Sequence, residues 1–228
     1  MSRPSVIAID GPAGVGKSVV SARLAAALGY VYLDTGAIYR AVTLLARRRG
    51  IPLDDEARLA ELATGLQIRI VAPTVADGRQ YTVLVDGEDV TWALFTADVD
   101  RSVSQVAAHP AVRQALLPVQ REAAHGRVVV AGRDIGTVIL PNADLKIYLD
   151  ASPEVRAKRR CQQLAKRGEP ADYAAVLADI LRRDQLDSER AAAPLRSAPD
   201  AVVIDTDDLS LEEELRIILE LCWKETAA

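Results

Sequence analysis

Residues 11–18, GPAGVGKS, constrain this chain more than any other segment. They follow a short apolar stretch, VIAID, and precede VVSARLAAAL, whose apolar residues recur with a helical period. A strand, a Gly-x-x-x-x-Gly-Lys-Ser loop and a helix, in this order, are typical of a phosphate-binding loop. The glycines let the backbone curl so that successive N–H groups point inward, and the positive end of the helix adds to the attraction for an anion. The segment therefore predicts a site for a nucleoside triphosphate.

Each position of the loop has an expected role toward ATP. We expect Lys17 to reach the β- and γ-phosphates and the Ser18 hydroxyl to bind Mg²⁺, with water and phosphate oxygens completing the metal's shell. The alternative interpretation of the same letters is a glycine-rich turn that binds nothing. The predicted ATP-binding residues are Gly11, Pro12, Ala13, Gly14, Val15, Gly16, Lys17, Ser18 and Val19.

The rest of the chain alternates short β-branched runs with longer segments of helical period. This order predicts an α/β fold of the P-loop type, with a doubly wound, five-stranded parallel sheet. Ser210, before LEEEL, is expected to cap the last helix. The expected strands are 6–9, 30–33, 128–130, 145–149 and 202–204, and the expected crossover helices are 17–28, 36–49, 153–167 and 209–221.

Two stretches interrupt the alternation. LQIRIVAP (66–73) and YTVLVDGEDV (81–90) predict a small antiparallel β insertion, which either decorates the surface or helps to grip a substrate. A helix-rich stretch, 97–124, broken at Pro110, returns the chain to the main sheet.

Composition narrows the classes of function. The 228 residues include 28 Lys and Arg against 32 Asp and Glu, a net charge of −4, so we expect no polymeric nucleic acid and no membrane as partner. Two distant cysteines and two histidines disfavour a structural zinc site. The start of the chain lacks a signal-peptide pattern, and no apolar run approaches the ~18 residues of a membrane span, so we expect a cytoplasmic protein.

A phosphate-binding loop alone does not distinguish a GTPase, an ATPase motor and a kinase. The single asparagine, Asn142, is followed by alanine, so the Asn-Lys-x-Asp element of guanine-specific switches is missing. The strand VVVA ends at Ala131, where a motor would carry a metal-organising carboxylate. Both observations favour a kinase.

The arginines indicate a second, phosphate-bearing substrate. Such an acceptor needs cations beside the donor, because two polyphosphates repel strongly, and arginine binds phosphate in a bidentate manner. Arg40 and Arg133 each follow a predicted strand, at the edge where doubly wound sheets bind ligands. Arg183, Asp187 and Arg190 are spaced i, i+4 and i+7, which predicts one stripe of a helix. A surface Arg183–Asp187 pair is the alternative interpretation.

Six segments together resemble the bacterial cytidylate kinase family: GPAGVGKS, LDTGAIYR, SQVAAHPAVR, GRDIGTVILP, ADLKIYLDAS and RRDQLDSERAAAPL. Their order and separation match across essentially the whole chain. The resemblance implies transfer of the γ-phosphate of ATP to CMP, and also to dCMP, with Mg²⁺, by a monomer in pyrimidine nucleotide metabolism. It implies a core (1–35, 97–152 and 190–228), a nucleoside monophosphate-binding region with the β insertion (36–96), and a lid (153–172) leading into helix 173–190.

The resemblance also implies roles for individual residues. The amino group of cytosine suits a carboxylate such as Asp134, and its N3 and O2 acceptors suit Arg113. The expected catalytic residues are Lys17, Arg133, Arg190 and, from the lid, Arg159, with Arg156 and Arg160 as further lid candidates. The implied CMP-binding residues are Arg40, Arg133, Arg190 and Thr35 at the phosphate, Ser104, Arg113 and Asp134 at the base, and Arg183 and Asp187 at the ribose.

One position departs from the family pattern. The family usually carries Glu or Asp where this chain has Ala131, and that carboxylate would be expected to help hold Mg²⁺ through water. Its absence predicts weaker metal binding or slower turnover, with Asp34 or Asp10 as substitutes. Two other functions remain open, namely a kinase of the same architecture for another acceptor, such as UMP or shikimate, and a switch that binds ATP without transferring phosphate.

Overall fold

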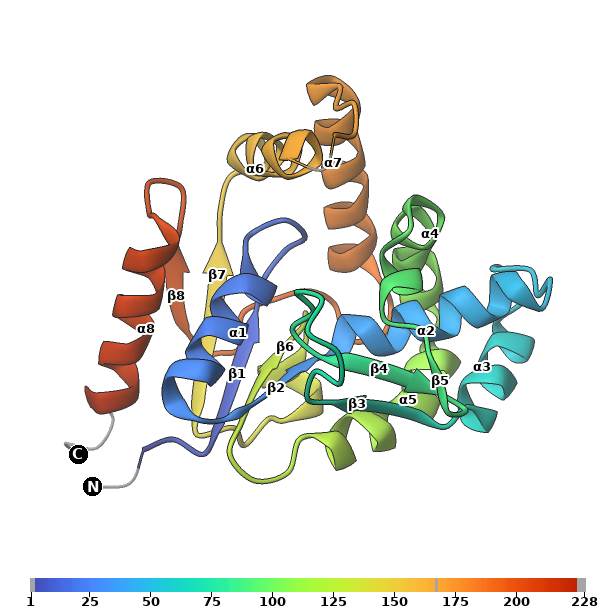
Figure 1. Cartoon of the computed structure of the whole chain (residues 1–228), viewed down its shortest axis with the longest axis horizontal. Helices are drawn as coiled ribbons and strands as arrows, with labels where there is room; N and C mark the ends of the chain where they lie inside the picture. The colour runs from blue at the N-terminus through green and yellow to red at the C-terminus, as the bar shows by residue number, and fades with distance from the viewer. Residues whose placement is uncertain (1–2, 167, 225–228) are drawn as a thin grey trace.

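A five-stranded parallel sheet forms the centre of the computed structural model, which describes residues 3–166 and 168–224 (Figure 1). The strand order is β2–β6–β1–β7–β8, so the strand that leads into the phosphate-binding loop lies in the middle. The five-stranded parallel sheet predicted from the sequence is confirmed, with boundaries shifted by at most one residue. The strands are β1 (Val6–Asp10), β2 (Val31–Asp34), β6 (Val128–Ala131), β7 (Leu145–Asp150) and β8 (Val202–Asp205).

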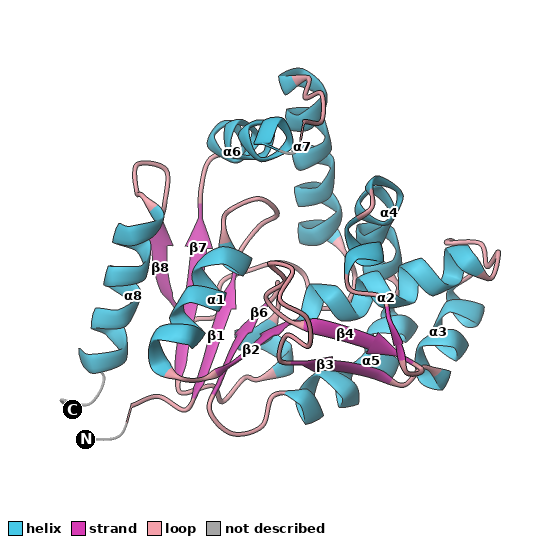
Figure 2. Cartoon of the chain, in the orientation of Figure 1, coloured by secondary structure: helices cyan, strands magenta, loops and turns pink. Residues whose placement is uncertain are grey.

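Alternate residues of these strands build two cores on opposite faces of the sheet, as the pleat requires. Ile7 and Ile9 of β1 belong to one buried cluster with residues of α1 (Lys17–Leu28) and α8 (Leu211–Lys224). Ala8, between them, belongs to another cluster with Ile135 and Ile139 of a short π-helix. Both faces of the sheet are covered in this way (Figure 2).

A third, larger core lies beside the sheet. It joins four helices to a small antiparallel sheet, β3 (Ile68–Val71), β4 (Thr82–Val85) and β5 (Glu88–Asp89), so the predicted β insertion is confirmed and gains a third strand. The sequence prediction missed one helix, α3, whose first turn is capped by Asp55 accepting a hydrogen bond from Arg58 N. The four helices are α2 (Thr35–Arg48), α3 (Glu56–Gly65), α4 (Ala97–Ala108) and α5 (Pro110–Ala123).

Two helices stand above the carboxyl edge of the main sheet: α6 (Pro153–Lys166) and α7 (Tyr173–Glu189) (Figure 1). The helix expected over 153–167 ends at Lys166, and residue 167 lies outside the described residues. Arg190 follows α7 in extended backbone (φ −60°, ψ 139°), so the expectation that it shares a helical stripe with Arg183 and Asp187 was wrong.

The start of α8 follows its prediction. Glu213 N donates to Ser210 Oγ at 3.3 Å, and the Glu213 carboxylate accepts from Ser210 N at 2.9 Å, which is a capping box. Across residues 3–166 and 168–224, none of the helices combines the length and the hydropathy that a bilayer crossing requires.

Candidate functional site

The phosphate-binding loop connects β1 to α1, as predicted, and depends on glycine backbone geometry. Gly11 has φ +149°, and a Cβ placed there would lie 2.2 Å from the carbonyl oxygen of Leu149. Gly16, at the start of α1, has φ +105°. Other residues rarely adopt these angles. The loop is therefore shaped by its own backbone and by close contact with the end of β7.

Lys17 lies over this loop rather than in solvent. Its ammonium donates to the carbonyl oxygens of Gly11 and Pro12, each at 2.7 Å, and 7% of the residue is exposed. Burial, together with the nearby charge of Arg133, lowers the pKa of Lys17 well below its usual value. A bound polyphosphate would favour the protonated ammonium again. Because Lys17 and Arg133 interact, the predicted donor and acceptor sides meet at this point.

Two arginines of α6 donate hydrogen bonds to carbonyl oxygens of the loop. The Arg156 guanidinium, which is 3% exposed, donates to Ala13 O at 3.0 Å and pairs with Asp184 of α7 at 2.6 Å. Arg159 donates to Val15 O at 3.4 Å and to Thr206 Oγ1, beyond β8, at 3.1 Å. Arg156 thus supports the loop, while Arg159 connects the loop to the end of the sheet.

The residues assigned to the base and the phosphate of CMP gather around Asp134. This buried carboxylate, just after β6, pairs with Arg113 of α5 through Oδ2 and with Arg190 at 3.4 Å through Oδ1. Arg133 donates from Nε to Asp187 of α7 at 3.0 Å. Residues from three separate parts of the chain therefore meet in one buried, charged cluster. The Arg183–Asp187 surface pair considered from the sequence does not form, because Asp187 binds Arg133.

A neighbouring cluster contains a residue that the sequence did not indicate. Asp100, in the first turn of α4, pairs with Arg40 of α2 at 2.5 Å and with Arg160 of α6 at 2.8 Å. Arg183 also lies within electrostatic reach of Arg40, Arg133 and Asp100. Asp100 stands in no motif, since acidic residues are common at the start of any helix. Only the packing of α2, α4 and α6 gives it this place.

Arg183 differs from the other arginines of the site. Among the described residues its side chain has neither an ion pair nor a hydrogen bond, and its buried Nε lacks a partner. Burial, followed by repulsion from Arg133, lowers its pKa. A half-buried guanidinium with an unpartnered Nε is costly, and an anionic ligand would relieve that cost.

Three of the remaining predicted residues are uncharged. Ser104 is buried on α4, and its hydroxyl has no hydrogen bond to another described residue. Thr35 donates from Oγ1 to Ala131 O at 3.0 Å, at the end of β6. Val19, in the first turn of α1, is 43% exposed.

The groups around Ser18 fit a hydrated cation. The Ser18 hydroxyl donates to Asp34 Oδ2 at 3.4 Å, and Asp34 lies beside Ala131 in the register of β2 and β6. The hydroxyl of Tyr32 is buried without a hydrogen-bond partner among the described residues, so it remains available to a metal-bound water. Burial and the charge of Asp34 raise the pKa of Tyr32, which keeps that hydroxyl neutral.

Asp10 is the other residue suggested to replace the carboxylate missing at Ala131, and both of its oxygens already have hydrogen-bond partners. Its two oxygens accept hydrogen bonds from Ile135 N and Gly136 N, both at 2.8 Å. Burial raises its pKa to about 6. Ser18 and Asp34 therefore fit the cation better than Asp10 does.

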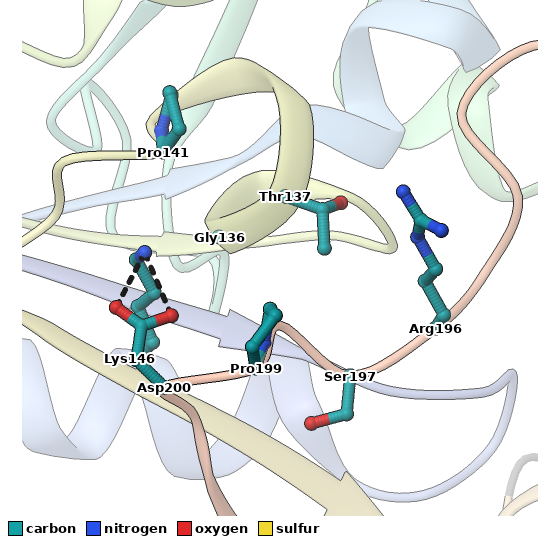
Figure 3. Close-up of a pocket in the computed structure, with 8 residues that line it drawn as sticks. All are labelled: Gly136, Thr137, Pro141, Lys146, Arg196, Ser197, Pro199 and Asp200. Carbon is teal, nitrogen blue, oxygen red and sulfur yellow. Dashed lines mark hydrogen bonds and ion pairs between the residues drawn. The ribbon is translucent and has the colours of Figure 1, made fainter.

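A cavity of about 330 Å³ lies elsewhere, between the π-helix, β7 and residues 196–200 (Figure 3). Lys146, on its wall, donates to both oxygens of Asp200 at 2.9 and 2.7 Å. Among the described residues that line it, none was assigned to ATP or CMP from the sequence. The cavity is thus distinct from the site around the loop.

Comparison with known proteins decides the family. A family profile described as "Cytidylate kinase" matches residues 7–224. A cytidylate kinase of Herpetosiphon aurantiacus is 52% identical over 229 residues, covering 100% of this chain and 98% of its own length. Another, from Chloroflexus aggregans, is 50% identical, covering 96% of this chain and 94% of its own. The chain belongs to the cytidylate kinase family.

A solved structure of another protein has a similar fold. A gluconokinase from Sinorhizobium meliloti 1021 matches with a TM-score of 0.50 at 18% identity, covering 98% of this chain and 94% of that one. At this identity the likeness concerns the fold alone. The predicted P-loop kinase architecture is confirmed. The substrate follows from the residues of the site in this chain.

Proposed function

We propose that this protein transfers the γ-phosphate of ATP to CMP or dCMP, giving ADP and CDP or dCDP. The observation that carries the proposal is the buried cluster in which Asp134 binds Arg113 and Arg190, while its sequence neighbour Arg133 pairs with Asp187. This cluster adjoins Lys17 of the phosphate-binding loop through Arg133. Membership of the cytidylate kinase family supports the same substrate.

Asp134 would recognise the cytosine ring. Its carboxylate can accept from the exocyclic amino group of cytosine, while Arg113 donates to the ring acceptors, with the Ser104 hydroxyl nearby. Uracil carries a carbonyl where cytosine carries the amino group, so it would place an acceptor rather than a donor against the Asp134 carboxylate. A mismatch of this kind in a buried site can produce discrimination of up to about 10⁴.

The guanidinium groups would hold the acceptor phosphate and stabilise the transfer. Arg40, Arg133 and Arg190, with Thr35, would bind the phosphate, and Arg183 and Asp187 would bind the ribose. An oxygen of the CMP phosphate attacks the γ-phosphorus directly, so no covalent enzyme intermediate forms. Lys17, Arg133, Arg159 and Arg190 would neutralise the charge on the transferring group. Arginine in this role contributes about 10³ to 10⁵ in rate in related systems.

Ser18 and Asp34 would hold Mg²⁺, Ser18 through its hydroxyl and Asp34 through water. When bound, the metal would neutralise and orient the phosphate oxygens of ATP. The loop residues 11–19 would surround the triphosphate and bind it through the backbone amides that are free to donate, which excludes Pro12, because it has no N–H, and Val19, whose N–H donates to Gly16 O at 3.1 Å.

The three regions of the chain would move relative to one another during turnover. Residues 1–35, 97–152 and 190–228 would form the core, residues 36–96 the CMP-binding region, and residues 153–172 a lid that leads into helix 173–190. Closing the lid would exclude water and suppress hydrolysis of ATP. We further propose that the protein acts as a monomer in the cytoplasm, within pyrimidine nucleotide metabolism.

An acceptor panel tests the proposed function. ADP release is measured by a coupled spectrophotometric assay with CMP, dCMP, UMP, AMP and shikimate in turn. The proposal predicts the highest kcat/KM for CMP or dCMP. Preference for any other acceptor would contradict it, and tight ATP binding without product after long incubation would instead indicate a nucleotide-binding switch.

A further inference from the structure

The small antiparallel sheet reaches the metal end of the phosphate-binding loop through one side chain. Tyr81, directly before β4, donates its hydroxyl to Asp34 Oδ2 at 3.3 Å. The tyrosine is 5% exposed, and its ring packs against Tyr32 with centroids 5.7 Å apart. In Figure 1 the connection between β3 and β4 extends toward the end of β2, where Asp34 lies. Tyr81 belongs to the region whose role the sequence left open.

Hydrogen bonds to both of its oxygens orient the Asp34 carboxylate. Its Oδ1 accepts from Gly36 N at 2.9 Å, which caps α2. Its Oδ2 accepts from two hydroxyls, those of Ser18 and Tyr81, at 3.4 and 3.3 Å. The Tyr81 hydroxyl is the donor in this contact, because a carboxylate oxygen can only accept. Oδ2 is therefore held facing Ser18.

The structure assigns Tyr81 a function in cation binding: we propose that it is a positioning residue that keeps Asp34 beside Ser18 for the Mg²⁺ that accompanies the nucleotide. The proposal rests on one part of the proposed function, the binding of ATP with Mg²⁺ at the phosphate-binding loop. It would account for a chain that lacks a carboxylate at Ala131, because Asp34 lies next to Ala131 in the sheet register and has a dedicated partner. Partners that orient such ligands commonly affect metal affinity by about 10- to 100-fold.

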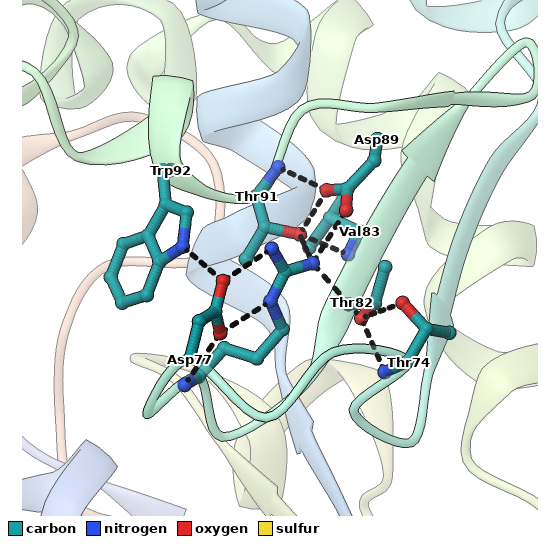
Figure 4. A network of polar contacts seen from close by, with 8 residues as sticks. Thr74, Asp77, Thr82, Val83, Asp89, Thr91 and Trp92 are labelled. Atoms are coloured by element: carbon teal, nitrogen blue, oxygen red, sulfur yellow. Dashed lines mark hydrogen bonds and ion pairs between the residues drawn. The ribbon is translucent and has the colours of Figure 1, made fainter.

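A network of polar contacts holds the segment that carries Tyr81 (Figure 4). Arg79, two residues earlier, pairs with Asp77 at 2.7 Å and with Asp89 of β5 at 2.5 Å. The Arg79 guanidinium lowers the pKa of Asp77, and hydrogen bonds from Thr91 and then Arg79 lower the pKa of Asp89 to about 2. Both carboxylates thus stay charged at neutral pH. These contacts connect the segment before Tyr81 to β5 of the small sheet.

A purely structural role for Tyr81 is the competing explanation. The ring fills space in the core around β4, and Tyr81→Phe would preserve that packing while removing the hydroxyl. Tyr30→Phe is a matched control, because the Tyr30 hydroxyl donates to Pro4 O at 2.9 Å, away from the site. Thermal unfolding of both variants checks that the fold is retained.

The test is calorimetric titration of ADP, without any acceptor, in excess EDTA and in saturating Mg²⁺. The ratio of the two dissociation constants measures how much the cation strengthens nucleotide binding. In Tyr81→Phe we expect this ratio to fall about tenfold, while the dissociation constant in EDTA stays the same. In Tyr30→Phe the ratio should match that of the unaltered chain.

A double-mutant cycle with Asp34→Asn shows whether Tyr81 acts through Asp34. We expect Asp34→Asn to lower the ratio, and Tyr81→Phe to add little once Asp34 has been replaced. A Tyr81→Phe ratio equal to that of the unaltered chain, or effects that simply add, would overturn the inference and leave the proposed function intact. A chain that binds no ADP under either condition would overturn both.

Discussion

The proposed donor and acceptor sides of this site are built in different ways. The phosphate-binding loop is eight consecutive residues whose backbone is shaped by glycines and by contact with β7. The acceptor cluster draws side chains from α2, α4, α5, α7 and the end of β6. Its charges are mostly paired with one another, as in Arg113–Asp134 and Arg133–Asp187. One side is a local backbone structure, and the other is an assembly of distant side chains.

This difference has a physical consequence. Inward-facing backbone amides need no rearrangement to receive an anion, because no other group competes for them. Guanidinium groups that already bind carboxylates must exchange partners when a phosphate arrives. Backbone changes should therefore abolish donor binding, while side-chain changes should alter acceptor binding and selectivity by degrees.

The largest expected effect is that of Gly11→Ala on the donor side. The new Cβ would meet the Leu149 carbonyl oxygen at 2.2 Å, so the loop must shift. We expect turnover to fall by about 10³-fold, since loss of even one preorganised donor costs 10² to 10³. Gly29→Ala is the matched control, because Gly29 also has positive φ (+69°) but open space around it. Kinetics with both variants test this, and a Gly11→Ala enzyme as active as Gly29→Ala would contradict it.

On the acceptor side, Asp134→Asn should change selectivity. Asparagine keeps the size of the side chain but offers an amino group to uracil and one fewer charge to Arg113 and Arg190. We expect the ratio of kcat/KM for CMP over UMP to fall by about 10²-fold, the value of a hydrogen bond to a charged group. Affinity for ADP should stay unchanged. An unaltered CMP preference would show that Asp134 does not read the base.

Asp10 links the two sides, and its ionisation should affect stability. Its folded-state pKa of about 6 lies above its usual 3.8, so the folded protein binds the proton more tightly and loses stability as pH rises through that interval. The free energy of unfolding falls by about 3 kcal/mol in total by pH 7, with roughly half of this decrease between pH 5 and pH 7. Urea unfolding across this range should show a slope that Asp10→Asn lacks. Parallel curves for the two proteins would contradict the assignment.

The smallest expected effect concerns Ala131. Restoring an acid with Ala131→Glu should lower the Mg²⁺ concentration for half-maximal activity by roughly three- to fivefold, because Asp34 already supplies one carboxylate beside Ser18. Ala131→Gln controls for the larger side chain at this 2% exposed position. Superimposable Mg²⁺ titrations for the alanine and glutamate proteins would show that the missing acid has no consequence.

The two regions also differ in how far the sequence predicts them. The loop and the five strands could be predicted because their signals lie within a few consecutive residues. The contacts of Tyr81 with Asp34 and of Asp100 with Arg40 join residues 47 and 60 positions apart, with no local pattern to reveal them. Arg190 was wrongly placed on a helical stripe because periodicity does not show where α7 ends. Helix α3 was missed because its short amphipathic run lies between less regular segments.

The central claim is that the loop backbone binds one nucleotide while buried guanidinium groups bind the other. Separate titrations of ADP and CMP into Arg183→Met test it most directly, because this arginine lacks an ion pair among the described residues and methionine keeps much of its apolar stem. We predict that the dissociation constant for CMP rises at least about tenfold, the value of one charge-assisted hydrogen bond, while that for ADP does not change. Equal weakening of both nucleotides, or unaltered CMP binding, would contradict the account.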